Sequence, residues 1–289
     1  MNKWIISIVA LLLSGYGFSQ DTVSIRYKSQ FAINVSGNTS RVKLVCLIPQ
    51  DLEGIHRVKH IAYSTEPSNI IEKNGNKYAE FNIFNPAIQA KVVVTADMEL
   101  YRNDLSTRTK SSDMAETEIK KYLKREQYIE KDHKHIRAKA KELKANTAQE
   151  TVENIYSFVR DEVKYSGYNP EDIGAVRTLK SRKGDCTEFA DLFVALCRAN
   201  RIPARVVEGL TIHYGNTPLH NWAQAYLEPH GWVSFDPTPG NSSTFTEMQN
   251  KYVQLSSVRN DDIINNYHFW SYWFWGDRVD VKSSYETER

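Results

Sequence analysis

A cysteine at the predicted start of a helix constrains this chain more than any other feature of its sequence. Residues 183–186 read KGDC and precede a helix-prone run that extends to about residue 200. Asp185 is a good N-cap candidate, and Gly184 permits a sharp turn of the backbone before the helix. Cys186 then lies in the first turn, where unpaired backbone N–H groups and the helix dipole favour a thiolate. The same N–H groups could stabilise an oxyanion beside the sulfur, so one turn offers a nucleophile and part of an oxyanion hole.

The chain of 289 residues holds three cysteines, which are too few for a disulfide framework and lack the spacing of a zinc site. Cys197 follows Cys186 by eleven residues on the same predicted helix, and this rise of about 16 Å is beyond disulfide reach. Apolar neighbours at helical spacing indicate that Cys197 fills the core, and Cys46 lies in a β-prone run and is predicted to do the same. Cys186 is therefore predicted to stay a free thiol, and no metal or cofactor site is predicted.

Three β-prone runs follow the helix, and the last two cover residues 220–226 and 231–236. If these two form an antiparallel hairpin centred on Glu228, His220 lies opposite Asp236, with their Cβ atoms about 4.5–5.5 Å apart. A carboxylate at that distance can orient an imidazole. The opposite face of the hairpin is then apolar and is predicted to pack on the core, with Ala223, Ala225, Val233 and Phe235.

A Cys, a His and an Asp in this order are the arrangement used for nucleophilic acyl transfer. The imidazole takes the thiol proton, and the carboxylate fixes the tautomer of the imidazole. Each residue alone usually has a structural role, because a cysteine in a helix is commonly core, a histidine in a strand is commonly a satisfied side chain, and an aspartate before proline is commonly part of a turn. Their joint occurrence favours a catalytic triad of Cys186, His220 and Asp236.

The motifs around these three residues resemble those of the bacterial transglutaminase-like family. The run GDCTEFADLFVALCRANRIPARVVEG is followed by HNWAQAYLEPHGWVSFDPTPG, and together they supply the GxC-type helix start, the IPAR-type turn, the HxW strand and the GWxxxDPT strand of that family. The resemblance covers about residues 145–245. It implies a papain-like α+β fold, in which a helix that bears the cysteine packs on an antiparallel sheet. It also implies that Cys186 is the nucleophile, His220 the general base and Asp236 the residue that orients this base.

Two tyrosines, Tyr165 and Tyr168, lie upstream of the cysteine in the loop-like run KYSGYNP. Enzymes related to this family often place an aromatic hydrogen-bond donor upstream as a second oxyanion group. The resemblance therefore makes Tyr165 a candidate substrate-binding residue. The alternative is a tyrosine that only packs in the loop.

Residues 20–101 are rich in short β-prone runs, several of which alternate apolar and polar residues as half-buried strands do. Turn signals separate these runs at residues 36–38 (SGN), 74–76 (NGN) and 85–86 (NP). This spacing predicts a small antiparallel domain of β-sandwich type. The resemblance agrees, because members of the family often carry a β-rich N-terminal domain.

Residues 102–145 mix charges of both signs and are predicted to be a charged helical linker with one or two solvent-facing helices. His133 and His135 lie in this linker. Residues two apart on a helix do not face each other, so these histidines do not predict a metal site.

The catalytic core is predicted over residues 146–250. It begins with a helix capped by a box of Thr147 and Glu150. The face of this helix that is predicted to meet the core carries an apolar stripe of Val152, Ile155, Tyr156, Val159 and Val163.

Residues 251–289 are predicted to be an aromatic-rich C-terminal extension. Six aromatic residues crowd into the seven positions from Phe269 to Trp275. If they are exposed, they form a patch for contact with carbohydrate, peptide or membrane. If they are buried, they complete the core of the catalytic domain, and burial or partial burial is the prediction.

Residues 1–19 have the three-part pattern of a secretory signal peptide. A polar, positive start precedes the apolar run WIISIVALLL, which is too short to span a bilayer, and small residues follow before Gln20. A membrane anchor is the alternative, and a lipid anchor is not expected because no cysteine precedes Cys46. The mature protein is predicted to be exported, to the periplasm or out of the cell, without a stable membrane anchor.

The amino-acid composition excludes several classes of protein. The formal net charge is +2, and 41% of residues are hydrophobic and 25% charged, which excludes a disordered chain and a multi-span membrane protein. Basic and acidic residues are nearly balanced, so the composition does not predict a surface that binds nucleic acid.

Two classes of function remain. One is a thiol enzyme that acts on amide bonds of peptides or proteins, as a protease, an amidase or a transglutaminase. The other is a catalytically inactive binding or scaffold protein with the same fold. Hydrolysis and transfer to an amine use the same three residues, so the sequence leaves that choice, the substrate and the oligomeric state open.

Overall fold

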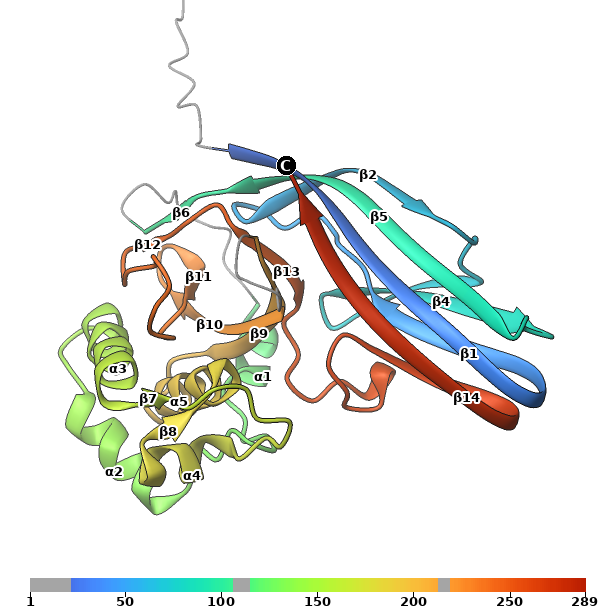
Figure 1. Ribbon diagram of the computed structural model, residues 1–289. Helices are drawn as coiled ribbons and strands as arrows, with labels where there is room; N and C mark the ends of the chain where they lie inside the picture. The colour runs from blue at the N-terminus through green and yellow to red at the C-terminus, as the bar shows by residue number, and fades with distance from the viewer. Residues whose placement is uncertain (1–21, 106–114, 213–218) are drawn as a thin grey trace, which may run out of the picture.

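A large N-terminal sheet and a smaller α+β unit lie against each other in the computed structural model of the chain (Figure 1). The structure describes residues 22–105, 115–212 and 219–289. The predicted signal peptide, residues 1–19, lies outside the described residues. Within the part of the chain that is described, no helix is long and apolar enough to cross a membrane.

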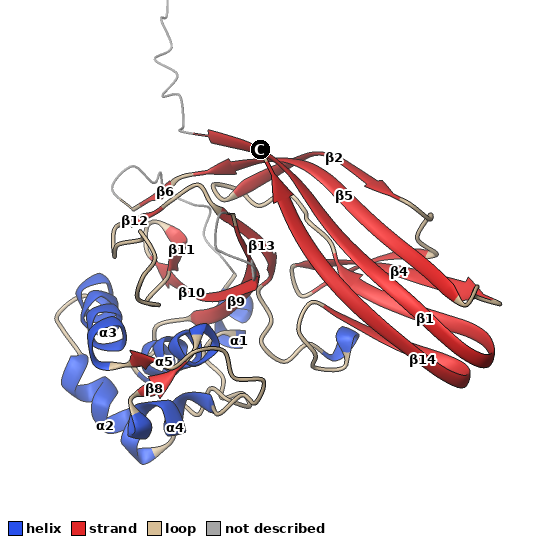
Figure 2. Cartoon of the chain, viewed as in Figure 1, coloured by secondary structure: helices blue, strands red, loops and turns tan. Residues whose placement is uncertain are grey.

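The long strand β1 (Thr22–Leu47) is the centre of the N-terminal sheet. Strand β14 (Trp270–Glu288), from the end of the chain, runs antiparallel along one edge of β1 (Figure 2). The other edge of β1 pairs with β5 along its first half and with β4 along its second half. The bounds of these strands and of the two outer strands are Gln89–Tyr101 (β5), Asn76–Phe84 (β4), His56–Tyr63 (β2) and Asn69–Lys73 (β3).

The predicted β-rich N-terminal region is confirmed, and so are two of its predicted turns. At residues 36–38 β1 bends back on itself, and its register against β14 shifts there. Phe31 lies before this bend and Cys46 after it, yet both belong to one buried cluster, and the ring of Trp270, which pairs with Cys46, lies 5.6 Å from the ring of Phe31. Gly37 has φ +76°, and an added Cβ would lie 2.2 Å from a carboxylate oxygen of Asp277. The two halves of β1 therefore pack face to face, as in the predicted sandwich, and the bend between them lies at the predicted turn (Figure 1). The turn at residues 74–76 is confirmed, since it joins β3 to β4.

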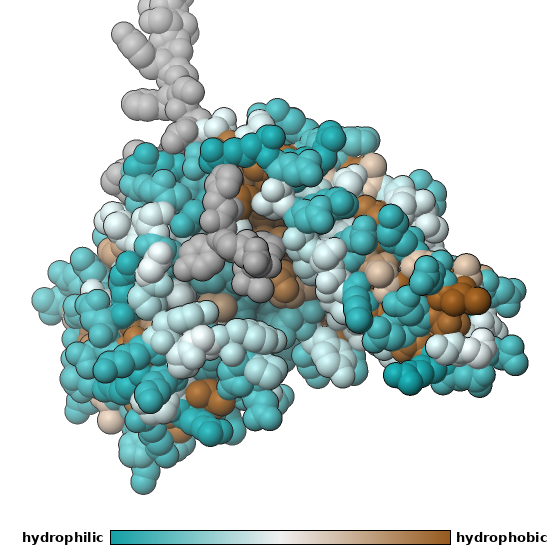
Figure 3. Space-filling view, viewed as in Figure 1, coloured by the Kyte–Doolittle hydropathy of each residue, from teal (hydrophilic) through white to brown (hydrophobic). Residues whose placement is uncertain are grey.

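Residues 251–289, which the sequence predicted to be an extension, supply one strand to each sheet. Strand β13 (Tyr252–Ser256) belongs to the sheet of the smaller unit, and β14 belongs to the N-terminal sheet. The aromatic run is partly buried, because Phe269 is buried whereas Trp275 is 46% exposed. Its buried side chains pack on the N-terminal sheet, because β14 pairs with β1. Apolar side chains also reach the surface of the N-terminal sheet (Figure 3). Ile88, in the connection between β4 and β5, is exposed.

The smaller unit contains a four-stranded antiparallel sheet of order β11–β10–β9–β13. Helix α5 packs on this sheet and is surrounded by α2, α3 and α4. This arrangement confirms the predicted α+β fold class. The bounds are Ala204–Thr211 (β9), Leu219–Leu227 (β10), Gly231–Phe235 (β11), Lys134–Leu143 (α2), Ala148–Glu162 (α3), Gly174–Ser181 (α4) and Cys186–Ala199 (α5). Short elements complete the chain: Asn103–Asp104 (β6), Glu116–Lys121 (α1), Lys164–Tyr165 (β7), Lys183–Gly184 (β8), Glu247–Met248 (β12) and Asp262–Ile264 (η1).

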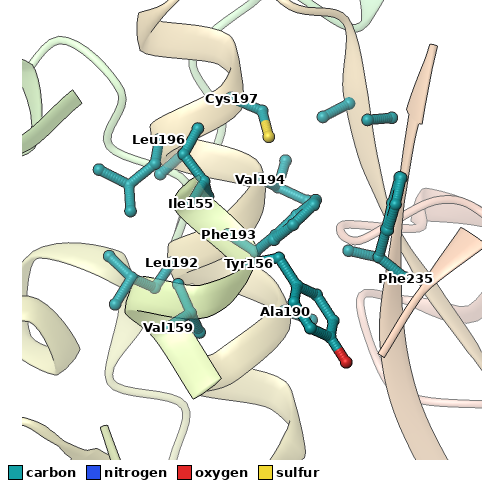
Figure 4. Packing of buried hydrophobic residues seen from close by; sticks show 14 of the residues in the cluster. Ile155, Tyr156, Val159, Ala190, Leu192, Phe193, Val194, Leu196, Cys197 and Phe235 are labelled. Carbon is teal, nitrogen blue, oxygen red and sulfur yellow. The ribbon is translucent and has the colours of Figure 1, made fainter. Parts of the chain in front are cut away.

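Helix α5 is the centre of the core of the smaller unit (Figure 4). Its residues from Thr187 to Arg198 are all buried, as expected for a helix that is covered on every side. The ring of Phe193 lies 5.6 Å from the ring of Phe235, between centroids. The predicted apolar face of the hairpin is confirmed, since its four residues belong to this core: Ala223, Ala225, Val233 and Phe235.

Of two helices around α5, one agrees with its prediction from the sequence and the other does not. Helix α3 begins as predicted, with the side chains of Thr147 and Glu150 each accepting a hydrogen bond from the backbone N–H of the other. Helix α2 was expected to face solvent within a linker, but Ile136 and Ala140 are buried in the core around α5. A narrow apolar stripe is enough for this contact, and the charged residues that dominate the helix cover its other faces.

The two sheets share an apolar interface. Val253 and Leu255 of β13 are buried in one cluster with Met98 and other residues of the N-terminal sheet. Polar contacts add to it, because His56 Nε2 lies 3.0 Å from the carbonyl oxygen of Gln254. The N-terminal sheet therefore holds β13 from the side opposite the helices.

Candidate active site

Cys186 is the first residue of α5 and is half-buried. The predicted N-cap is confirmed, because Asp185 Oδ1 accepts a hydrogen bond of 2.9 Å from the backbone N–H of Thr187. Glu188 completes a capping box, since its Oε2 atom accepts a hydrogen bond of 3.0 Å from the Asp185 backbone N–H. These contacts fix the direction in which the helix begins and so fix the place of the thiol.

Gly184 permits this tight helix start. An added Cβ at Gly184 would lie 2.3 Å from the Cβ atom of Glu188, which is itself buried. Since the neighbouring atom is held in the core, Gly184→Ala is expected to destabilise the fold by about 1–3 kcal/mol, as overpacked sites do. Thermal unfolding of the two proteins measures this difference, and an unchanged Tm would contradict the close approach.

His220 and Asp236 meet on the sheet beside α5. His220 lies in β10, and Asp236 follows the last residue of β11. Their side chains are joined by a hydrogen bond of 2.7 Å between His220 Nε2 and Asp236 Oδ2. Asp236 is fully buried and also accepts hydrogen bonds from the Thr238 backbone N–H at 3.1 Å and from the Tyr252 hydroxyl at 2.7 Å.

The predicted register of the hairpin is wrong, although the two residues meet as predicted. The observed pairs include Gln224 with Ser234 and Leu227 with Gly231, so the hairpin is centred on residue 229 rather than on Glu228. This displaces each partner by two positions. A shift by an even number leaves every side chain on its own face, so His220 and Asp236 still share a face and meet along a diagonal.

The charges of this pair support each other. Burial opposes a charged imidazole, but the Asp236 carboxylate and its hydrogen bond outweigh burial and raise the pKa of His220 to about 10. The Cys186 side chain adds to this as a second hydrogen-bond partner of His220, and Nδ1 is the ring nitrogen left for it. Burial likewise opposes the Asp236 carboxylate, but His220, Tyr252 and Thr238 hold the pKa of Asp236 below its usual value. The site therefore holds an imidazolium between a thiol and a buried carboxylate.

A family model described as the transglutaminase-like superfamily matches residues 137–237. These residues form a transglutaminase-like core. The matched range contains Cys186, His220 and Asp236, and its helices and strands are those of the smaller unit. The resemblance in the motifs is thereby confirmed at the level of the superfamily.

A solved structure shares this fold. A candidate cysteine protease from Cytophaga hutchinsonii superposes with a TM-score of 0.68 at 19% identity, over 93% of this chain and 91% of that one. The periplasmic domain of TgpA from Pseudomonas aeruginosa superposes with a TM-score of 0.43 at 17% identity, over 70% of this chain and 71% of that one. The first of these likenesses covers the N-terminal sheet as well as the transglutaminase-like core, and at this identity it establishes the fold alone.

A relative in sequence covers only part of the chain. The uncharacterized protein YebA of Bacillus subtilis is 31% identical over 99 residues, which are 29% of this chain and 13% of YebA. The shared segment is thus a small part of that relative.

The other two cysteines fill the core, as predicted. Cys46 and Cys197 are both fully buried. Burial raises the pKa of the Cys46 thiol to about 12 and raises that of Cys197 as well. Cys186, in the transglutaminase-like core, is the one of the three thiols that solvent can reach.

Tyr165 lies beside the segment that leads to the cysteine. It is 51% exposed, and β7 pairs it with Gly184 of β8 in parallel register. The backbone N–H of Ser166 extends this contact, because it donates to the Gly184 carbonyl at 2.9 Å. This position is compatible with the predicted contact to substrate, which stays a prediction.

Three further side chains border the site and were not singled out from the sequence. Asn221 donates to the Thr187 hydroxyl at 2.8 Å, which ties the strand of the histidine to the helix of the cysteine. The ring of Trp222 stacks beside that of His220, with centroids 6.1 Å apart. Both belong to the HNW motif and could have been chosen from it, whereas Tyr252 carries no local signal.

Metal ligands were not predicted, and the described ranges contain no group of three His, Cys, Asp or Glu side chains that could hold a metal ion. His133 has a structural role instead. It is the N-cap of α2, and its Nδ1 atom accepts a hydrogen bond from the His135 backbone N–H at 3.3 Å.

Proposed function

We propose that the protein is a thiol enzyme that acts on amide bonds of peptides or proteins, with Cys186 as nucleophile, His220 as base and acid, and Asp236 as the residue that orients His220. The observation that carries this proposal is the line of contacts from the half-buried thiol, through the raised-pKa imidazole, to the buried carboxylate. A thiolate paired with an imidazolium is the reactive form in thiol enzymes.

The reaction proceeds in two stages. The Cys186 thiolate attacks the carbonyl carbon, and backbone N–H groups at the start of α5 stabilise the resulting oxyanion. The C–N bond then breaks, the amine leaves with a proton from the His220 imidazolium, and the acyl group remains on sulfur as a thioester. In the second stage, neutral His220 takes a proton from the acceptor as the acceptor attacks. The C–S bond breaks, which restores the thiolate and the imidazolium.

The acceptor decides the reaction class. Water gives a protease or amidase, and a primary amine gives a transglutaminase. The name given to the Cytophaga hutchinsonii protein favours hydrolysis in that protein, and we extend hydrolysis to this chain as the first reaction to test.

One assay separates these outcomes. The mature protein is incubated with a glutamine-containing peptide and a fluorescent primary amine, and mass spectrometry follows both products. Cleaved or deamidated peptide identifies hydrolysis, and a peptide that carries the amine identifies transfer. If neither product forms with a panel of peptides, and if an electrophile labels Cys186 no faster than a cysteine of the unfolded chain, the inactive scaffold protein becomes the better account.

We also propose that the protein is exported, because residues 1–19 have the composition of a signal peptide. Expression of the full chain in a bacterial host, followed by mass determination, is expected to give a product that begins at Gln20. A product of full length in the cytoplasm would contradict export.

A further inference from the structure

The strand β13 brings a tyrosine to the carboxylate of the triad. Tyr252 is buried, and its hydroxyl lies 2.7 Å from Asp236 Oδ2 and 2.9 Å from the Ser243 hydroxyl. A carboxylate can only accept, so Tyr252 donates to Asp236 and is left to accept from Ser243. Ser243 therefore donates to Tyr252 and Tyr252 donates to Asp236, and the same carboxylate oxygen accepts from the ring of His220.

We propose that Tyr252 is a positioning residue of the active site, which holds the Asp236 carboxylate in the orientation that His220 requires. This inference rests on the proposed function, since it concerns the same triad. It assigns a role to a residue that lies outside the matched range, residues 137–237.

The geometry supports a role beyond filling space. Tyr252 and His220 both approach the same carboxylate oxygen, Oδ2, at 2.7 Å. Oδ1 is bound separately by the Thr238 backbone N–H. With both oxygens held, the carboxylate cannot rotate about its Cβ–Cγ bond without breaking a buried hydrogen bond.

The ring of Tyr252 contacts the rings beside the triad. It lies 5.2 Å from Trp222 and 6.2 Å from His220, between centroids. A phenylalanine at this position would keep these contacts and remove only the hydroxyl. Burial and the neighbouring carboxylate raise the pKa of Tyr252, so the hydroxyl stays a donor throughout the range in which the protein is stable.

The N-terminal sheet determines where Tyr252 lies. Side chains alternate along β13: Val253 and Leu255 are buried in the interface with the N-terminal sheet, whereas Tyr252 and Gln254 point to the opposite side, where Gln254 Oε1 accepts from Gln224. The strand β13 thus connects the N-terminal sheet to the triad.

The other titratable groups near this pair are Lys251 and Tyr156, both of which interact with Asp236. Arg160 contacts Tyr156 and the Thr238 carbonyl. Lys251 Nζ lies 5.6 Å from the centroid of the Tyr252 ring, a contact that phenylalanine keeps. Tyr252→Phe also leaves Lys251, Tyr156 and Arg160 in place, so a shift in pH dependence would report on Asp236 and His220.

The test compares Tyr252→Phe with the matched variant Tyr78→Phe. Tyr78 is also buried, and its hydroxyl also donates to a buried carboxylate, that of Asp261, away from the triad. Two quantities are measured from pH 5 to 11: hydrolysis of p-nitrophenyl acetate, and the rate at which iodoacetamide alkylates Cys186, read by mass spectrometry. Both variants are expected to lose thermal stability by a similar amount.

Only Tyr252→Phe is expected to lower kcat and the alkylation rate, by about tenfold and at unchanged KM, since one hydrogen bond to a charged group is lost. Its alkylation profile should extend to higher pH, because the carboxylate that faces His220 has lost a donor and holds the imidazolium more strongly. Ser243→Ala, which keeps the tyrosine, should shift the profile in the same direction by less.

Alkylation in Tyr252→Phe that matches the wild type in rate and pH profile would overturn the positioning role while leaving the proposed function in place. Slow alkylation of the wild type itself, no faster than in urea, would overturn the proposed function. A profile that moves equally in Tyr78→Phe would assign the effect to stability and overturn the positioning role.

Discussion

Replacing Cys186 with alanine is expected to lower kcat/KM by at least about 10⁴-fold, because no other group in the site can form the thioester. The thiol is half-buried and lies outside the apolar core clusters, so the fold should survive its loss. Steady-state hydrolysis of p-nitrophenyl acetate and of the peptide identified by the amine assay measures the effect.

Cys197→Ala is the matched control for this variant. It also removes a thiol from α5, but that thiol is fully buried in the core, so the expected cost is stability rather than rate. An activity of Cys186→Ala equal to that of Cys197→Ala would exclude Cys186 as the nucleophile.

Asp236→Asn is expected to lower kcat/KM by about 10³–10⁴-fold while it keeps the shape of the site. An amide can donate to His220 Nε2, so the ring would hold its proton on the nitrogen that faces Cys186 and could no longer take a proton from the thiol. Loss of the carboxylate also leaves burial as the main influence on the imidazole, so the pKa of His220 should fall from about 10 to below its ordinary value of 6.5.

The pH dependence of this variant follows from these shifts. In the wild type the raised pKa of His220 keeps the imidazolium charged up to about pH 10, which sets the basic limb of the rate profile. In Asp236→Asn that limb should lie below pH 6.5. A variant that keeps the wild-type limb would contradict the ion pair.

Stability gives an independent check on the same pair. Because the folded pKa of His220 is raised, its contribution is complete below pH 6.5 and is lost as pH rises through about 10. Because the folded pKa of Asp236 is lowered, its contribution is present above its ordinary value of 3.8 and is lost as pH falls through the folded value. Urea unfolding should therefore show the largest difference between wild type and Asp236→Asn near pH 5–6, and a smaller one near pH 10.

The parts of the site that follow from local rules could be predicted from the sequence. The N-cap role of Asp185 depends on a few neighbouring residues, and so does the capping box of Thr147. The predicted register of the hairpin was wrong, but the predicted contact between His220 and Asp236 was right. Alternation assigns His220 and Asp236 to one face for any even shift, and that parity depends only on positions in the sequence.

The parts that depend on distant segments could not be predicted in this way. No local signal in residues 270–288 indicates that they pair with β1 on both sides of its bend at residues 36–38. The role inferred for Tyr252 has the same origin, since β13 lies near Asp236 because it pairs with β9, more than forty residues earlier in the chain. Pairing between distant strands determines where these residues lie, and the pattern of residues within a short stretch of sequence does not indicate which strands pair.

The most direct test of the central claim is to trap the acyl group on the protein. The mature protein is mixed with p-nitrophenyl acetate, quenched in acid within the first turnover, digested, and analysed by mass spectrometry. We predict a single acetyl group on the peptide that contains Cys186, removable by neutral hydroxylamine as a thioester is, and none on the peptides of Cys46 and Cys197. Turnover without a hydroxylamine-sensitive acetyl group on Cys186, or an acetyl group found only on another residue, would contradict the account.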